Sequence, residues 1–145
     1  NNVRCSTLVI PESALDFELN HIMLATDFHN TDTPNYFGTL IKLLDETSAS
    51  LSIVNVQEHL DLTQVPTEME VKIDNLFGKY KHSHHFLESE NIEEALFDFA
   101  HLNSCDLIVV LTKHYSIWQR LWHKSLAKKL TLHSTIPLLI LHEEV

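Results

Sequence analysis

The fold is decided by the stretch Leu107-Ile-Val-Val-Leu-Thr-Lys-His-Tyr-Ser-Ile-Trp-Gln-Arg-Leu-Trp-His-Lys-Ser125 and its continuation to Ile136-Pro-Leu-Leu-Ile-Leu141. Its two apolar ends are typical of buried strands, and the residues between them predict a long connection followed by a helix. In an α/β fold, a connection at this place usually forms the ligand-binding loop. Such loops use glycine to approach phosphate, yet Gly38 and Gly78 are the only glycines and neither follows a strand. The sequence therefore predicts the frame of a nucleotide site without its usual lining.

Outward from this stretch, strand and helix patterns alternate along the chain. Strands are predicted at residues 6–10, 21–26, 51–56, 84–87, 107–111 and 138–141. Helices are predicted to begin at Asp32 or Thr33, at Pro66 and Thr67, after Asn91 and near Trp122, with the last one ending at His133. This alternation is typical of parallel strands joined by right-handed crossovers, with helices on both faces of the sheet.

Composition narrows the class of protein. The length of 145 residues fits one α/β domain. A net charge of −10, with eleven histidines counted as neutral, argues against nucleic acid or an anionic membrane as a partner. No apolar run reaches the length of a membrane span, so a cytoplasmic protein is expected. Two cysteines are too few for a disulfide scaffold, and Cys105, just before an apolar strand, is expected to be a buried, reduced thiol.

The first twenty residues are unusual for the start of a domain. They combine a short strand at residues 6–10 with a polar linker at residues 13–20. Two interpretations fit: an N-terminal arm, or the remnant of a preceding domain. We favour the remnant, because residues 7–11 and 136–140 have similar character, as two copies of one terminal strand would have. The domain proper then covers residues 21–145.

Residues 21–142 resemble a universal stress protein domain. The matching segments are Ile22-Met-Leu-Ala-Thr-Asp-Phe28, Leu51-Ser-Ile-Val-Asn-Val56, Cys105-Asp-Leu-Ile-Val-Val110, and Arg120-Leu-Trp-His-Lys-Ser-Leu-Ala-Lys-Lys-Leu130 followed by Ser134-Thr-Ile-Pro-Leu-Leu-Ile140. The resemblance implies a five-stranded parallel sheet in the order 3-2-1-4-5. Because members of this family often carry two such domains, it also implies a homodimer, or a pseudo-dimer of tandem domains, formed through the terminal edge strand.

Many members of the family bind ATP through a loop with three glycines followed by serine or threonine. On this sequence the glycine positions hold Leu111, His114 and Lys124, and only Ser125 matches. Asp27 matches the acidic residue that lies near the adenosine in the family. Left-handed backbone costs a residue other than glycine roughly 1–2 kcal/mol. The resemblance therefore implies a degenerate ATP loop, with no cofactor or only weakly bound ATP at these five positions.

The charge of the loop leaves a second interpretation open. The basic side chains of this region are Lys113, His114, Arg120, His123, Lys124, Lys128 and Lys129. Cationic side chains can bind phosphate without glycine, and Trp118 and Trp122 could stack on an adenine. In the alternative interpretation, the lysines form the solvated face of the last helix and the tryptophans pack the loop onto the domain.

Catalytic and metal-binding patterns are weak. In His82-Ser-His-His85, strand alternation puts His82 and His84 on one face and His85 on the other. No carboxylate is expected to complete a set of ligands, so no metal site is predicted. Ser125 lacks the Gly-x-Ser-x-Gly setting of a nucleophile elbow, and no enzymatic activity is expected.

Two functional classes follow from these patterns. The first is a stress-response domain that acts as a dimerisation or regulatory module with a degenerate ATP loop. The second is a stress protein that binds ATP or AMP through a remodelled basic loop. Retained glycines would have favoured the second class, and their absence favours the first.

Overall fold

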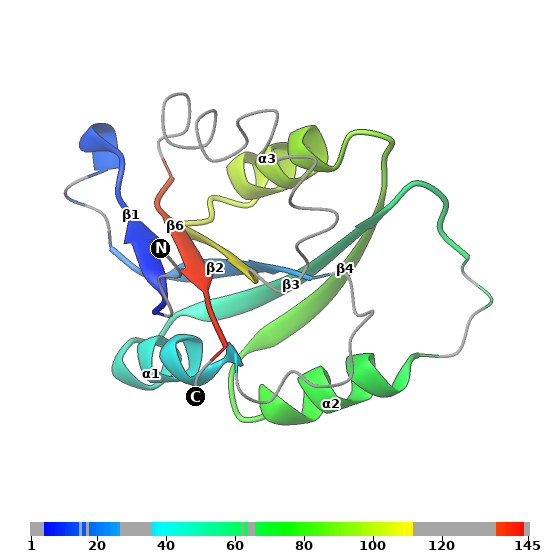
Figure 1. Cartoon of the computed structure of the whole chain (residues 1–145), viewed down its shortest axis with the longest axis horizontal. Coiled ribbons are helices and arrows are strands. Elements are labelled where there is room, and N and C mark those ends of the chain that lie inside the picture. Colours follow the sequence, from blue (N-terminus) through cyan, green and yellow to red (C-terminus); the bar gives the residue numbers. More distant parts are fainter. Residues whose placement is uncertain are drawn as a thin grey trace.

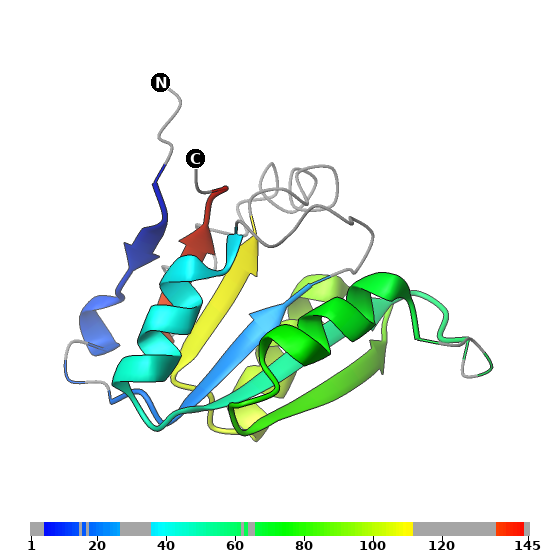
Figure 2. The ribbon, with the colours of Figure 1, turned by 90° about the horizontal axis from the view of Figure 1, so that it is seen from below.

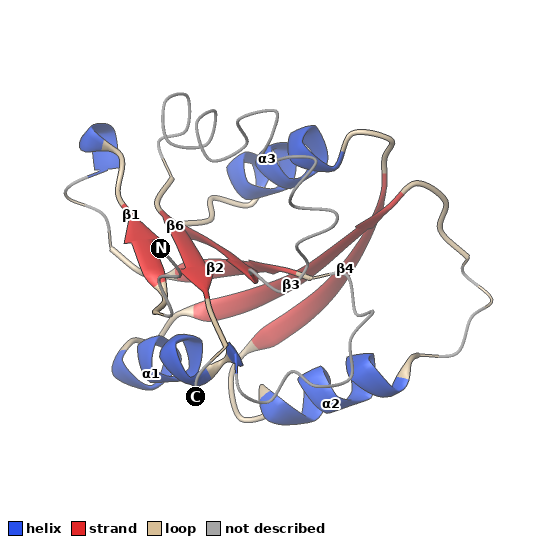
Figure 3. Cartoon of the chain, viewed as in Figure 1, coloured by secondary structure: helices blue, strands red, loops and turns tan. Residues whose placement is uncertain are grey.

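The computed structural model describes residues 5–14, 16, 18–26, 36–61, 63, 66–111 and 136–143. They form a six-stranded sheet in the order β1-β6-β5-β2-β3-β4 (Figures 1 and 3). The strands are β1 (Thr7–Val9), β2 (His21–Ala25), β3 (Ser50–Gln57), β4 (His82–Glu88), β5 (Leu107–Leu111) and β6 (Leu138–Leu141). All six predicted strands are present, and β4 extends beyond its predicted bounds at both ends.

The five strands from β2 to β6 pair in parallel, and their spatial order is the predicted 3-2-1-4-5. β1 adds an antiparallel strand at the edge of β6, with Leu8 opposite Leu139. The N-terminal strand thus pairs with the terminal strand within one chain. This pairing supplies β6 with hydrogen-bond partners on both sides, whereas β1 and β4 form the edges of the sheet (Figure 2).

Three α-helices are described: α1 (Gly38–Glu46), α2 (Glu68–Leu76) and α3 (Ile92–Leu102), with a short 3-10 turn, η1, at Glu12–Ala14. Thr67 caps α2 and Asn91 caps α3, as predicted. The prediction for α1 was wrong at its start, since α1 begins at Gly38 after Phe37, which provides no side-chain cap. The predicted helix from Trp122 to His133 lies outside the described residues.

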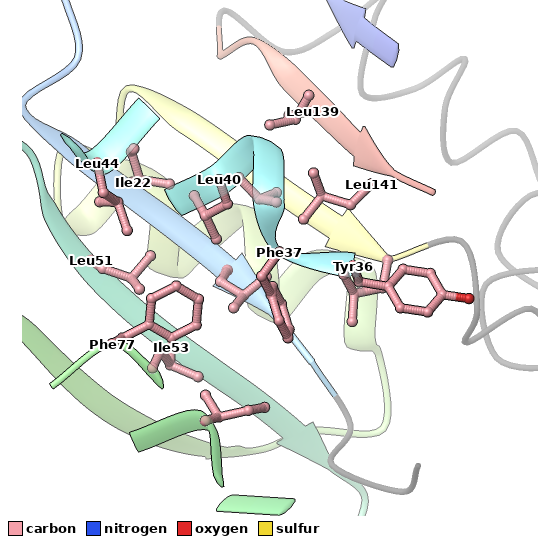
Figure 4. Packing of buried hydrophobic residues seen from close by; sticks show 14 of the residues in the cluster. Ile22, Tyr36, Phe37, Leu40, Leu44, Leu51, Ile53, Phe77, Leu139 and Leu141 are labelled. Atoms are coloured by element: carbon pink, nitrogen blue, oxygen red, sulfur yellow. The ribbon is translucent and has the colours of Figure 1, made fainter. Parts of the chain in front are cut away.

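The helices cover both faces of the sheet. α1 and α2 lie on one face and α3 on the other (Figures 1 and 2). Side chains alternate along each strand, so every buried strand contributes to two apolar clusters. The cluster beneath α1 and α2 includes Ile22, Phe37, Leu51, Phe77 and Leu139 (Figure 4).

The opposite cluster includes Met23, Val54, Phe99, Ile108 and Ile140. β5 and β6 are buried along their whole length, which explains why they read as continuous apolar runs rather than as alternating patterns. No described helix has the length and apolar character needed to cross a membrane.

Candidate functional site at the carboxyl ends of the strands

The sheet reverses its winding direction between β2 and β5. The chain passes from β2 to β3 on one side, whereas β5 returns to the other side of β2. In open parallel sheets, ligands bind at the carboxyl ends of the strands that flank such a reversal. Here these ends are Ala25 with Thr26, and Val110 with Leu111, and Ala25 pairs with Val110.

Asn55 fixes the backbone at this point from the neighbouring strand. Its Nδ2 donates a 2.9 Å hydrogen bond to the carbonyl oxygen of Thr26, and the Thr26 N–H donates to the carbonyl of Val54 at 3.0 Å. Asn55 is 1% exposed, and within the described parts of the chain its Oδ1 accepts no hydrogen bond. A buried acceptor without a donor costs about 1–3 kcal/mol. The end of β2 is therefore held rigidly beside a polar atom that could accept a hydrogen bond.

Leu111 is a buried strand residue rather than an exposed loop residue. It is the last residue of β5, pairs with Leu141, and is 1% exposed in the cluster beneath α1 and α2. Among the described residues other than glycine, a positive φ occurs at Ser104 alone, with a value of 51°. The backbone strain expected where this leucine replaces a loop glycine is therefore not found, because Leu111 extends the strand and fills the core.

The other four ATP-site positions of the family, Asp27, His114, Lys124 and Ser125, lie outside the described residues. The basic side chains of the connection and the two tryptophans, Trp118 and Trp122, also lie there. The roles expected of these residues in nucleotide binding thus stay predictions.

A second cluster of polar side chains lies at the opposite edge of the sheet from β1. His82 Nε2 is 2.7 Å and His84 Nε2 is 3.1 Å from Oδ1 of Asp74, a residue of α2. The ligand-type atoms of the three residues all lie within 4.8 Å of one another. The prediction that no carboxylate accompanies the histidine pair was wrong, because Asp74, eight residues upstream in another element, supplies one.

Charge and hydrogen bonding couple the members of this cluster. The hydrogen bonds from His82 and then His84 hold the pKa of the Asp74 carboxyl below its usual range. The hydrogen bond to Asp74, followed by the one between Nδ1 and the carbonyl of Tyr80, raises the pKa of His82. His85 lies on the other face of β4, where its ring packs 4.8 Å from that of Phe99, and burial lowers its pKa.

Sequence reasoning missed Asp74 because the histidine spacing shows only which residues share a face of a strand. The sequence did hold one indication of this contact. Asp74 lies in the last turns of α2, and a short connection joins α2 to β4, the strand that carries both histidines. Phe77, at the start of that connection, is buried, and the centroid of its ring lies 5.4 Å from that of Phe37.

Comparisons with known proteins agree with this architecture. The universal stress protein family profile matches residues 18–142, so the chain belongs to the universal stress protein family. It is similar to the crystal structure of a universal stress protein family member from Burkholderia pseudomallei, with a TM-score of 0.51 and 18% identity over 83% of this chain and 94% of that one.

It is also similar to the crystal structure of a universal stress protein from Archaeoglobus fulgidus, with a TM-score of 0.58 and 12% identity. That match covers 86% of this chain and 44% of the other, so this chain spans less than half of the length of that protein. At such identities the likeness concerns the fold. A comparison with curated proteins gives no match.

Proposed function

We propose that this domain acts in the stress response as a dimerisation or regulatory module, with a degenerate ATP loop and no enzymatic activity. The observation that carries the proposal is the replacement of the three loop glycines of the family by Leu111, His114 and Lys124. Leu111 supports it further, because its side chain fills the core at the end of β5. A leucine used in this way presents no backbone cradle to a phosphate.

The edge formed by β1 supports the dimerisation part of the proposal. β1 pairs with β6 through one side of its backbone, so its other side can accept a strand from a second copy. Leu8 and Ile10 are exposed on this edge, at 48% and 41%. In a homodimer, the second copy would cover both residues. In a tandem protein, the preceding domain would cover this edge instead.

Titration of Mg-ATP by calorimetry tests the ATP part. We expect a dissociation constant no tighter than high micromolar, and mass spectrometry of the purified native protein should find no stoichiometric nucleotide. A low-micromolar constant, or co-purified ATP or AMP, would overturn the degenerate loop and establish the alternative function.

Light scattering coupled to size exclusion tests the dimerisation part. We expect a wild-type dimer that Leu8→Lys converts to a monomer, because the charge is placed on the exposed edge and not in the core. Val71→Lys is the matched control, since Val71 is an apolar residue of α2 with 49% exposure. A monomeric wild type, or a dimer that survives Leu8→Lys, would contradict assembly through this edge.

The alternative function, nucleotide binding through a remodelled basic loop, is favoured by one specific observation. Asn55 Oδ1 is a buried acceptor beside the end of β2, at the place where the sheet reverses its winding. Asp27, retained in the sequence, follows directly after Thr26. If this alternative holds, Asp27→Ala should weaken ATP binding, whereas the exposed control Asp98→Ala should not.

A further inference from the structure

We propose that Asp74, His82 and His84 form a binding site for a divalent transition-metal ion such as Zn²⁺. The site is separate from the carboxyl ends of β2 and β5. It lies between α2 and the edge strand β4, and it does not depend on the proposed function. Its donor set, two imidazole nitrogens and one carboxylate oxygen, is a combination that zinc accepts in proteins.

The geometry brings three donor atoms to one point. His82 and His84 are two residues apart on β4, so their rings project from the same face, and their centroids lie 5.7 Å apart. Both Nε2 atoms approach the same Asp74 oxygen, at 2.7 and 3.1 Å. In a tetrahedral zinc site, ligand atoms are separated by about 3.3 Å. The carboxylate oxygen would therefore withdraw from His82 Nε2 by about half an ångström to admit an ion, and all three donor atoms lie within 4.8 Å of one another.

The backbone sets His82 in the orientation that metal binding requires. Its Nδ1 lies 2.9 Å from the carbonyl oxygen of Tyr80, and this nitrogen must donate because a carbonyl only accepts. Nε2 donates to the Asp74 carboxylate, so a metal ion would take the place of this proton, and the Nε2 lone pair would then face the ion. A hydrogen bond from the second ring nitrogen to a backbone carbonyl is the usual support of a metal-binding histidine.

The three residues are carried by rigid elements. His82 and His84 pair with Leu51 and Ile53 in the β3 ladder. Asp74 lies in α2, whose buried face includes Met69 and Ile73. The histidine side chains are 16% and 24% exposed, and that of Asp74 is 55% exposed. An ion can thus enter from solvent, and water can occupy its remaining coordination positions.

Calorimetric titration of the tag-free chain with Zn²⁺ at pH 7.5 tests the site. We expect one equivalent to bind at micromolar free zinc and to raise the melting temperature, with both effects reversed by a chelator. Asp74→Asn and His84→Gln should each weaken binding at least about tenfold, a loss expected even for partners that only support a metal ligand. Circular dichroism checks that both variants are folded.

Two matched controls separate this site from the other histidines and carboxylates. Asp98→Asn changes an exposed helical carboxylate and His59→Gln an exposed histidine, and both should bind zinc as the wild type does. The double variant His82→Gln/His84→Gln should lose the one-equivalent isotherm. Absence of saturable zinc binding to the wild type, or unchanged binding in the double variant, would overturn the proposal.

Discussion

Asp106 and His21 are linked twice across the amino-terminal ends of neighbouring strands. The carboxylate Oδ2 of Asp106 accepts a 2.9 Å hydrogen bond from the His21 N–H, and the Asp106 N–H donates to the His21 carbonyl at 2.8 Å. The same Oδ2 accepts from the N–H of Asn20, also at 2.9 Å. One side chain thus satisfies two backbone donors where β2 begins, so Asp106 has a structural role at the start of β5.

Asp106→Ala should destabilise the domain. It leaves the N–H groups of Asn20 and His21 without their acceptor, and hydrogen bonds to a charged group contribute about 1.5–3 kcal/mol each when they are buried. Because this site is only half-buried, we expect a loss of about 1–2 kcal/mol in the free energy of unfolding, measured in urea. Asp98→Ala, on the exposed face of α3, should change it little. Equal stability of the two variants would contradict the role of Asp106.

The capping box of α2 gives a second prediction. Thr67 Oγ1 accepts from the Glu70 N–H at 3.2 Å, and the Glu70 carboxylate accepts from the Thr67 N–H at 2.9 Å. Thr67→Ala should lower the free energy of unfolding by about 1 kcal/mol. Glu70→Gln keeps an acceptor at the third helical position and should cost much less. Thermal denaturation of both variants tests this prediction. If Thr67→Ala and Glu70→Gln lower the free energy of unfolding equally, the two hydrogen bonds do not stabilise the helix as a capping box.

The two thiols should react very differently with iodoacetamide. Cys105 is 5% exposed, and burial followed by the charge of Asp106 raises its pKa to about 11, whereas Cys5 is exposed. Only the thiolate is nucleophilic. At pH 8 mass spectrometry should find one modified cysteine per native chain, and two after unfolding in guanidinium. Rapid labelling of both thiols in the native protein would show that Cys105 is accessible.

The raised pKa of Cys105 also predicts that the protein loses stability at alkaline pH. A raised pKa means that the folded thiol keeps its proton after the unfolded one, with a pKa of about 8.5, has lost it. The folded state then binds more protons, so stability is fully present below the unfolded pKa and falls as the pH rises toward 11. Chemical unfolding from pH 7 to 10.5 should show a steeper decline for the wild type than for Cys105→Ala. Parallel declines would exclude this thiol as the cause.

Much of the fold could be predicted because the apolar patterns are local. Leu107–Leu111 and Leu138–Leu141 are buried on both sides, so they contain no polar residue and are recognisable without any knowledge of neighbours. Thr67 and Asn91 were recognised as caps because capping uses hydrogen bonds within one turn. The start of α1 at Gly38 was not, because Phe37 is buried at that point by tertiary packing, without a side-chain cap.

At the candidate nucleotide site, too, one part could be read from the sequence and another part required the structure. The absence of glycine at positions 111, 114 and 124 is a fact of the sequence, and it requires no coordinates. The consequence at Leu111 does require them, since only the packing of β5 against α1 and α2 shows that this leucine fills the core without strain.

The sequence by itself determined the alternation of strands and helices, because period-two and helical patterns lie along the chain, and its resemblance to universal stress proteins predicted the family and the strand order. Only the tertiary structure decided that Asp74 meets His82 and His84 and that β1 covers the edge of β6. Both arrangements join residues of different elements. Their distances depend on how α2 packs beside β4 and on which strand pairs with the free side of β6, and the residues near either position in sequence do not encode those distances.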